Sequence, residues 1–342
     1  MRHPENYIDR LADLIALYLR SHTSFPPSYQ SLAKKFKIND GDLERALNTL
    51  RAWGYGVKCD HNGRVAFTGA PDTLSSAELS FALKTKLMGR IIHAYRSVQS
   101  TNTVASQLAG AGALEGEMVV AETQTRGRGR LGRFWHSPEK LGAYFSLILR
   151  PKIAPADAPA LSIVAALALA EAIENVTSLT PELKWPNDVF ISTTPGGAGK
   201  KVAGILTELS AEIDRIHYVV VGVGVNINHR KTDFPSELRD HATSIRIATK
   251  AVVSRVEILQ AFLRTFEDLY SIFQKRGFPA LRKKALARSA LIGQVIKLRD
   301  SGKPGGALSG RAVDIDEKGR LVVQTAHARL TLSSGEVTLH RD

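Results

Sequence analysis

Two breaks in composition divide this sequence into three parts, and the division constrains the fold more than any single motif does. The first break is the turn-forming run Gly69-Ala70-Pro71-Asp72, followed at Thr73 to Ser76 by a helix-start pattern with Glu78 as its capping-box partner. The second lies near residue 290, where a basic helical stretch gives way to short strand patterns. The chain has 342 residues, more than one ordinary domain. We therefore expect three domains, at residues 1–72, 73–289 and 290–342.

The first part predicts three helices followed by a hairpin. Apolar residues at positions 8, 11, 14, 15 and 19 have helical spacing, and further helices are expected over Ser28–Phe36 and Asp42–Trp53, with a turn at residues 38–41 between them. A turn at residues 60–63 then closes a hairpin. This order is typical of a winged helix-turn-helix. The candidate DNA-binding side chains are Lys34, Lys35, Asn39, Arg45 and Arg64.

The same part raises a doubt about DNA binding. The presumed recognition helix opens with three acids, Asp40, Asp42 and Glu44, although attraction to phosphates supplies much of the affinity for DNA. The alternative is a winged helix that serves dimerisation or positions an acceptor protein.

The second and third parts predict an α+β protein. Strands are expected over Met118–Glu122, Ala143–Leu149, Glu182–Trp185, Val189–Ser192, Ala203–Leu209 and His217–Gly224, and helices over Pro159–Val176 and Val256–Gln274. Several strands follow one another through short turns, which favours a mixed sheet over a doubly wound parallel one. Residue 290 onward predicts five short strands and a small SH3-like barrel, over Val295–Arg299, Ala307–Ile315, Leu321–Thr325, Ala328–Leu332 and Val337–His340.

Several classes of protein are disfavoured. The single cysteine, Cys59, can form no internal disulfide, which favours a reducing cytoplasm. The N-terminus lacks a signal-peptide core, and the longest nearly apolar run, Ala160 to Ala170, is too short to span a bilayer. We expect a soluble cytoplasmic protein without a membrane partner. The metalloprotease, α/β-hydrolase and paired-carboxylate glycosidase signatures are missing from the sequence.

The run from Gln124 to Trp135 (QTRGRGRLGRFW) is the most informative segment. Its glycines satisfy the letters G-x-G-x-x-G, but the residues that follow start a helix poorly, so we reject a dinucleotide-binding loop. The glycines allow a mobile backbone to close over a ligand, and the arginines supply donors for carboxylate and phosphate oxygens. A solvated or nucleic-acid-binding Arg/Gly tract is the alternative.

Three further segments carry polar groups at strand ends. Lys184-Trp185-Pro186-Asn187-Asp188 places a cation and a carboxylate near one another, although a surface turn has the same composition. Lys201 follows a glycine-rich run that does not meet the P-loop pattern, and it remains a phosphate candidate. In Gly222-Val223-Gly224-Val225-Asn226-Ile227-Asn228 the glycines permit close approach, and the two asparagines suit a base or ribose; a pair of packing glycines is the alternative.

In this order, these motifs resemble those of the biotin protein ligases, specifically the bifunctional bacterial ligase/biotin operon repressors. The matching elements are Ser100-Thr101-Asn102, Gln124 with Gly127–Arg133 and Trp135, Lys184–Asp188, Lys201–Leu206, and Gly222–Asn228. The resemblance covers nearly the whole chain and implies a class II synthetase-like central domain.

The resemblance implies a reaction in two steps and a set of site residues. Biotin reacts with ATP to give biotinyl-5′-AMP, which then acylates a lysine of a biotin carboxyl carrier protein of acetyl-CoA carboxylase. The residues implied to bind biotin are Ser100, Thr101, Asn102, Gln124, Arg128, Gly129, Arg130, Trp135 and Lys184. Those implied to bind ATP or the adenylate are Arg130, Arg133, Lys201, Asn226 and Asn228. Lys184, Arg130, Arg133 and Asp188 are the implied catalytic group.

The partners expected from the resemblance are Mg²⁺, whose ligands the sequence does not identify, operator DNA and a second copy of the chain. A ligase without repressor activity and a lipoate-type ligase are the alternatives. The net charge of +13 first suggests nucleic acid. However, residues 1–72 hold 10 Lys and Arg against 8 Asp and Glu, whereas residues 73–289 hold 28 against 19. The excess charge therefore favours ATP and an acidic acceptor as the main anionic partners.

Overall fold

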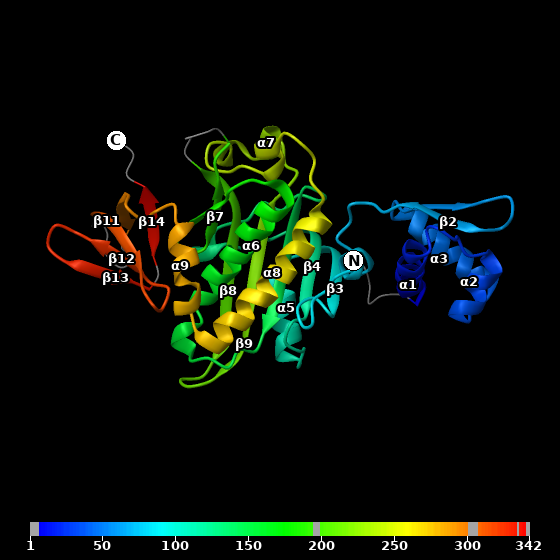
Figure 1. The fold of residues 1–342 in the computed structure, drawn as a ribbon, viewed down its shortest axis with the longest axis horizontal. Coiled ribbons are helices and arrows are strands. Elements are labelled where there is room, and N and C mark those ends of the chain that lie inside the picture. The colour runs from blue at the N-terminus through cyan, green and yellow to red at the C-terminus, as the bar shows by residue number, and fades with distance from the viewer. Residues whose placement is uncertain (1–6, 194–198, 300–306, 334, 340–342) are drawn as a thin grey trace.

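The computed structural model describes residues 7–193, 199–299, 307–333 and 335–339. The N-terminal region, the central sheet with its helices and the C-terminal sheet follow one another along the long axis of the molecule (Figure 1). His340, the last residue of the final expected strand, lies outside the described residues.

The N-terminal region contains the three helices and the hairpin in the expected order. Its helices and strands are α1 (Tyr7–Ser21), α2 (Tyr29–Phe36), α3 (Asp40–Ala52), β1 (Gly56–Cys59) and β2 (Val65–Gly69). The two strands pair antiparallel. Apolar side chains from all three helices and both strands form one core, in which Ile15, Leu32 and Leu47 are fully buried.

Helix α3 begins two residues earlier than expected. Asn39 lies in extended backbone and its side chain accepts a hydrogen bond from the Asp42 backbone N–H at 2.8 Å, so it is the N-cap. The residues predicted as a turn therefore supply the cap and the first helical turn.

A short connecting segment leads from β2 to the central sheet and includes α4 (Ser76–Ser80). Ser75 caps α4 by accepting from the Glu78 N–H, as the helix-start pattern predicts. The Glu78 carboxylate does not close a capping box; it forms an ion pair with Arg20 of α1 and so links the N-terminal region to the central one.

The central region contains a seven-stranded mixed sheet, which confirms the expected sheet type. The strand order is β3-β4-β5-β9-β8-β7-β6, with β3 parallel to β4 and the other neighbours antiparallel. The strands are β3 (Ile92–Val98), β4 (Met118–Gln124), β5 (Gly142–Leu149), β6 (Glu182–Lys184), β7 (Asp188–Ile191), β8 (Lys200–Ala211) and β9 (Ile216–Asn226). Strand β3 and the helix after it, α5 (Thr101–Gly110), were not predicted from the sequence.

Helices cover both faces of this sheet. Helices α6 (Ala160–Thr177), α8 (Arg255–Arg276) and α9 (Pro279–Ala287) share one core with one face, as the ribbon shows for α6 and α8 (Figure 1). Helix α5 packs on the other face, where it meets Val119, Ile148 and Val220. In β4, β5 and β9, neighbouring residues thus enter different cores. The short α7 (Ile245–Thr249) follows the loop after β9.

Helix α6 corresponds to the expected apolar helix. It is the one helix of the described chain that is long and apolar enough to cross a bilayer, but 67% of it is buried within the protein. Its contacts with α8 and the sheet are those of a core helix.

The C-terminal region is a five-stranded antiparallel sheet of order β13-β12-β11-β10-β14. Its strands are β10 (Val295–Arg299), β11 (Ala307–Ile315), β12 (Leu321–Gln324), β13 (Arg329–Leu332) and β14 (Glu336–Leu339). Arg282 of α9 donates two hydrogen bonds to the Asp314 carboxylate, and Trp185 Nε1 donates to the Gly319 carbonyl at 2.9 Å. The Trp185 side chain therefore holds the C-terminal sheet against the central region.

Candidate functional site

Polar side chains gather where β4 and β9 end and β5 begins. Thr101 and Asn102 lie in the first turn of α5 and are buried. The Gln124 side chain accepts from the Thr101 backbone N–H at 2.9 Å and donates to Ser137 Oγ at 3.0 Å. Gln124 thus joins the start of α5 to the segment that follows the Arg/Gly loop.

Asn102 is held from three sides. Its Nδ2 donates to the Leu206 carbonyl at 3.2 Å and to the Glu208 carboxylate at 2.7 Å, and its Oδ1 accepts from Ser146 Oγ at 2.6 Å. Since these bonds use both ends of the amide, Asn102 has a fixed orientation. The nearby Ser100 hydroxyl has no hydrogen-bond partner within the described chain and is available to a ligand.

The glycines of β9 leave room for side chains of the same protein. A Cβ on Gly222 would lie 2.7 Å from Asn102 Cγ, and one on Gly224 would lie 2.5 Å from Trp135 Cε2. Trp135 also lies 3.2 Å from the Cβ position of Gly204 on β8. The close approach expected at the β9 glycines is therefore observed. Because these positions carry no side chain, Asn102 and Trp135 can pack directly against the backbone of the sheet.

The Arg/Gly loop does not open an α-helix, as expected. Arg130–Gly132 form a single 3₁₀ turn with Leu131 in left-handed backbone (φ 56°), and the chain continues extended. Arg128 forms an ion pair with Glu208 (Nη2 to Oε1, 3.1 Å), and Arg130 Nη1 donates to Asn187 Oδ1 at 3.1 Å. Two arginines thus tie the loop to β8 and to the turn between β6 and β7.

That turn carries the Lys184–Asp188 motif, with a cis peptide bond before Pro186. Lys184 ends β6 and Asp188 begins β7, so the two residues face each other in the antiparallel register. Lys184 Nζ lies over the Phe190 ring, 5.1 Å from its centroid.

Lys201 lies within β8 rather than at a helix start, which is consistent with rejecting a P-loop. Its ammonium group is 2.7 Å from Asp188 Oδ1 and 5.3 Å from the centroid of the Trp135 ring. Lys201, Asp188 and Trp135 therefore form one cluster at the glycine-lined part of the sheet.

The two asparagines at and just after the end of β9 differ in their hydrogen bonding. Asn226 is buried, and within the described chain its side chain makes no hydrogen bond. The Asn228 amide donates to the Val253 carbonyl at 2.8 Å and accepts from the Val253 N–H at 3.0 Å. Asn228 thus fixes the segment before α8, and Asn226 is the one with free hydrogen-bonding capacity.

His229 follows directly and is fully buried. Its ring stacks on Phe234 at 4.9 Å, and neither ring nitrogen has a hydrogen-bond partner in the described chain. Burial, together with repulsion from His136 and against the attraction of Asp233, lowers the pKa of His229 to about 4. His229 is therefore neutral near pH 7.

Three residues of the site were not predicted from the sequence: Ser137, Ser146 and Glu208. Ser146 is a lone polar residue in a fully buried strand, and Glu208 alternates with Gly204 and Leu206 on one face of β8. These two patterns are signals that could have identified them.

Most of the predicted site residues thus lie at one end of the sheet or on the loop next to it. Arg133 is exposed on the loop, and Gly129 lies beside it, its N–H donating to the Arg133 carbonyl at 2.7 Å. The candidate DNA-binding residues lie apart, in the N-terminal region, and Lys34, Lys35, Asn39, Arg45 and Arg64 are all exposed.

Comparison with known proteins decides the family. The chain is 35% identical to the bifunctional ligase/repressor BirA of Bacillus subtilis over 327 residues, which cover 96% of this chain and 98% of that protein. The chain belongs to the biotin protein ligase family. The family described as biotin/lipoate A/B protein ligase matches residues 94–226 of this ligase, and the biotin protein ligase C-terminal domain matches residues 291–339.

Other relatives agree with this assignment. The ligase is 34% identical to the biotin–[acetyl-CoA-carboxylase] ligase of Mycobacterium tuberculosis, covering 70% of this chain and 85% of that protein. The biotin protein ligase of Aquifex aeolicus, solved in complex with biotin and ATP, matches with a TM-score of 0.62 and 32% identity, covering 74% of this chain and all of that one.

Proposed function

We propose that this ligase activates biotin with ATP and transfers it to a lysine of a carrier protein. In the first step a biotin carboxylate oxygen bonds to the α-phosphorus of ATP and pyrophosphate leaves. In the second, the lysine amine attacks the acyl carbon of biotinyl-5′-AMP and AMP leaves. The observation that carries the proposal is the meeting of the Arg128 and Arg130 loop with the Thr101–Asn102–Gln124 cluster at one end of the sheet.

The polar cluster suits the biotin head group. Ser100 offers a free hydroxyl, while Thr101, Asn102 and Gln124 are already oriented by internal hydrogen bonds. Groups fixed in this way lose little conformational entropy when a ligand binds. In this proposal Trp135, lying on Gly224, walls the pocket and excludes water from the acyl-adenylate.

Cations serve the anionic end of the ligand. Arg128 and Arg130 reach protein acceptors through exchangeable, partly exposed contacts, so a carboxylate or phosphate can take over their donors. Gly129 lets the loop backbone approach the ligand, and Lys184 and Arg133 stabilise charge on the phosphate oxygens as the bond to phosphorus forms. In this proposal Lys201 contacts a phosphate, and Asn226 hydrogen-bonds the ribose or the base. Asn228 supports this end of the site by holding the segment before α8.

The residues present do not form a dedicated magnesium site. Within the described chain no three His, Cys, Asp or Glu residues cluster to hold a metal, and the Asp188 carboxylate is paired with Lys201. Mg²⁺ is often held largely by substrate phosphates, so in this proposal it arrives with ATP. Asp188 orients Lys201 or receives the incoming lysine amine.

We assign the biotin carboxyl carrier protein of acetyl-CoA carboxylase as the acceptor and the cytoplasm as the compartment. The relative from Mycobacterium tuberculosis bears the name of such a ligase. The test incubates the ligase, biotin, ATP and the isolated carrier domain, and measures the mass of the carrier. A mass increase of one biotinyl group, lost when the acceptor lysine is replaced by arginine, supports the proposal. An unchanged carrier contradicts it.

A second function rests on the N-terminal region. The match with the Bacillus subtilis protein, named a ligase/repressor, extends over 98% of that protein, and three helices and a hairpin precede the catalytic part here. We propose that residues 1–72 form a winged helix-turn-helix domain, that residues 73–289 are the class II synthetase-like catalytic domain and that residues 290–342 form an SH3-like barrel. A homodimer carrying biotinyl-AMP then represses the biotin genes.

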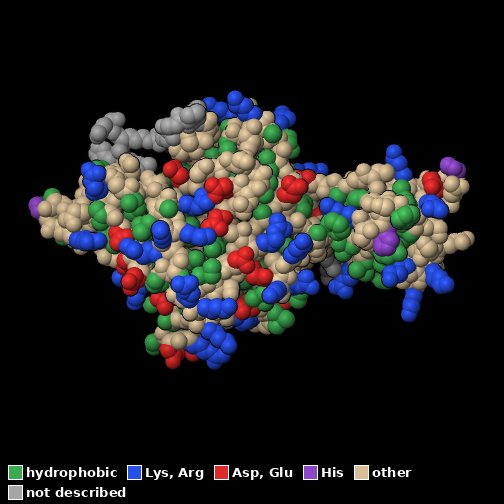
Figure 2. Space-filling view, in the orientation of Figure 1, with side chains coloured by type: hydrophobic (Ala, Val, Ile, Leu, Met, Phe, Trp, Pro, Cys, Tyr) green, Lys and Arg blue, Asp and Glu red, His purple; other side chains and the backbone are tan. Residues whose placement is uncertain are grey.

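The charges around α3 make this repressor proposal testable. Asp42 binds two of the candidate DNA-binding side chains: it accepts a hydrogen bond from Asn39 Nδ2 at 3.1 Å and forms an ion pair with Arg45. Lys and Arg side chains lie around the outer part of the N-terminal region on the face shown in Figure 2. A mobility-shift assay with the organism's own biotin promoter, biotin and ATP should show a retarded complex, and the double variant Lys34→Ala/Lys35→Ala should lower its salt slope by about 2. Unretarded DNA at low salt contradicts the repressor role and leaves the ligase-only alternative.

A further inference from the structure

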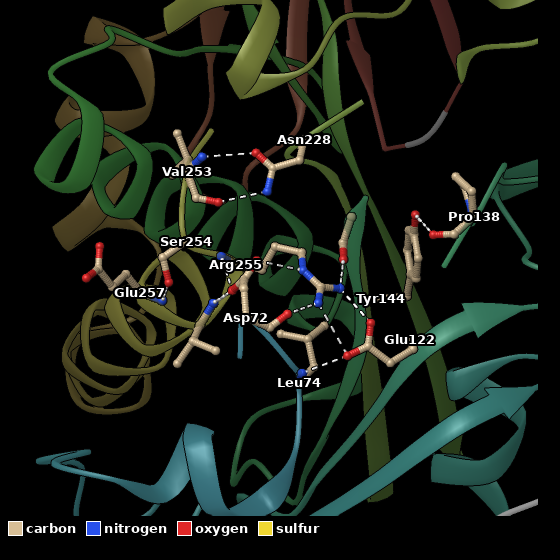
Figure 3. A network of polar contacts seen from close by, with 12 residues as sticks. Asp72, Leu74, Glu122, Pro138, Tyr144, Asn228, Val253, Ser254, Arg255 and Glu257 are labelled. Carbon is tan, nitrogen blue, oxygen red and sulfur yellow. Dashed lines mark hydrogen bonds and ion pairs between the residues drawn. The ribbon is translucent and has the colours of Figure 1, made fainter. Parts of the chain in front are cut away.

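Arg255, the first residue of α8, is among the most deeply buried side chains of the protein, with 1% of its side chain exposed (Figure 3). Its Nη1 donates to Glu122 Oε2 at 2.6 Å and to the Gly142 carbonyl at 3.3 Å. Its Nε donates to Asp72 Oδ2 at 3.0 Å, and its Nη2 to the Asp72 carbonyl. One guanidinium group therefore binds β4, β5 and the segment that follows the N-terminal region.

The charges in this network depend on one another. Burial by itself would lower the pKa of Arg255, but the carboxylates of Glu122 and Asp72 outweigh burial and raise it, so the guanidinium is charged. Removing the cation would leave Glu122 largely buried without its partner, a costly arrangement. The geometry is thus specific to arginine, whose planar group serves several acceptors at once.

Arg255 contacts two strands near the site, β4 and β5, and a third strand, β9, pairs with β5 there. Glu122 lies on β4 two residues before Gln124, near the end of the strand; Glu122 pairs with Arg255 of α8, and Gln124 bonds Thr101 at the start of α5. Gly142 begins β5 and pairs in register with Asn226 of β9. Two residues after the end of β9, Asn228 binds Val253, which lies two residues before Arg255 (Figure 3).

The same network holds the connecting segment. Glu122 Oε1 accepts from the Leu74 N–H at 2.8 Å, and the Asp72 carboxylate accepts from the Arg255 N–H at 2.9 Å. Further along α8, Gln260 donates to carbonyls at the end of α4, and Glu267 accepts from three consecutive N–H groups, those of Lys86, Leu87 and Met88. Three side chains of α8 thus bind the connecting segment, and of these Arg255 also contacts the strands of the site.

We propose that Arg255 is a positioning residue for the ligase reaction, and that Asp72 makes this positioning depend on the connecting segment. The inference rests on the proposed ligase function. Arg255 holds the ends of β4 and β5, and through them the orientation of Gln124 and Asn226, without touching a substrate. Asp72 supplies two acceptors to the guanidinium. Displacing the segment after β2 therefore weakens the hold of Arg255 on β4 and β5, and with it the order of the ligand site.

The test compares variants of the full chain in steady-state ligase assays. Asp72→Asn and Arg255→Lys should raise the KM for biotin and for ATP by about threefold or more, a size expected for coupling through packed elements, with a smaller change in kcat. Arg255→Lys should retain part of the affinity that Arg255→Met loses. Asp72 is 37% exposed, so its variant provides a folded protein even where a substitution of Arg255 does not.

Glu267→Gln is the matched control, because it loosens the same segment from the same helix far along α8 from Arg255. It should lower the melting temperature and leave both KM values unchanged. Hydrogen exchange provides the second readout: the Thr101 N–H, bound to Gln124, should exchange faster in Asp72→Asn and at the wild-type rate in Glu267→Gln. Wild-type KM values and exchange in Asp72→Asn, or equal KM increases in both variants, overturn the inference. An inactive wild-type protein would instead contradict the proposed function.

Discussion

Gly222 of β9 and Asn102 of α5 occupy one shared space: a Cβ at position 222 would lie 2.7 Å from Asn102 Cγ. Asn102 cannot move aside freely, since Leu206, Glu208 and Ser146 fix its amide. The absence of one side chain in the sheet therefore determines where a candidate biotin-binding side chain lies.

Gly222→Ala should displace Asn102 and weaken biotin binding. We expect the dissociation constant measured by titration calorimetry to rise about tenfold or more, the cost of roughly one misplaced hydrogen bond. Gly110→Ala is the control on the same helix as Asn102, because no atom lies within 4 Å of its Cβ position. Equal affinities in the Gly222 variant and the wild type would show that Asn102 plays no part in binding.

Lys184→Ala should slow formation of biotinyl-AMP by about 100-fold or more, a size typical of groups that stabilise charge in a transition state. Single-turnover assays with radiolabelled ATP measure this step. Lys200→Ala is a neighbouring lysine control, since Lys200 Nζ donates only to the Arg239 carbonyl within the described chain. Adenylate formation at the wild-type rate in the Lys184 variant would remove Lys184 from the catalytic group.

Arg130→Gly should shorten the retention of biotinyl-AMP. The variant loses the cation that we propose binds the adenylate, and it loses the bond from Arg130 to Asn187, so the loop is no longer tied to the turn between β6 and β7. We expect the adenylate to dissociate about tenfold faster or more in a filter-binding assay. Asn187→Ala, which removes the bond but keeps the cation, should show a smaller increase. Identical dissociation from Arg130→Gly and the wild type would contradict the role of the loop.

His229 should make the fold sensitive to acid. Its pKa is about 4 in the folded protein and near 6.5 in an unfolded chain, so the unfolded state takes up the proton first. The stabilising contribution is complete above about pH 6.5 and is lost as the pH falls toward 4, by roughly 3 kcal/mol in total.

Urea unfolding at pH 7 and pH 4.5 measures this contribution. His229→Leu should reduce the loss of stability between these pH values, whereas His61→Leu at an exposed position should not. A wild-type pH dependence in the His229 variant would show that other groups cause the acid sensitivity.

The sequence predicted those features that depend on local patterns. The apolar run of α6 and the mixed order of the central strands come from burial and short turns, and both are observed. The glycines of β9 indicated a close approach, but not that Asn102 and Trp135 would fill the space. The partner of a glycine lies far away in the sequence, and periodicity carries no information about it.

The residues missed by the sequence are those whose roles depend on long-range contacts. In the sequence Glu208 resembles other strand residues, and its role follows only from its contacts with Asn102 and Arg128 in the fold. Arg255 precedes the expected helix by one residue, and only the fold brings Glu122 and Asp72 to it. Conversely, the sequence predicts Asn228 to bind a ligand, but both ends of its amide are hydrogen-bonded to the backbone of Val253.

The most direct test of the central claim is the exchange of label between pyrophosphate and ATP catalysed by the full chain. The proposed chemistry predicts exchange that requires biotin, because pyrophosphate must re-form ATP from biotinyl-AMP, and none when lipoate replaces biotin. Exchange that depends on lipoate, or no exchange with biotin, would contradict the assignment of this site to biotin activation.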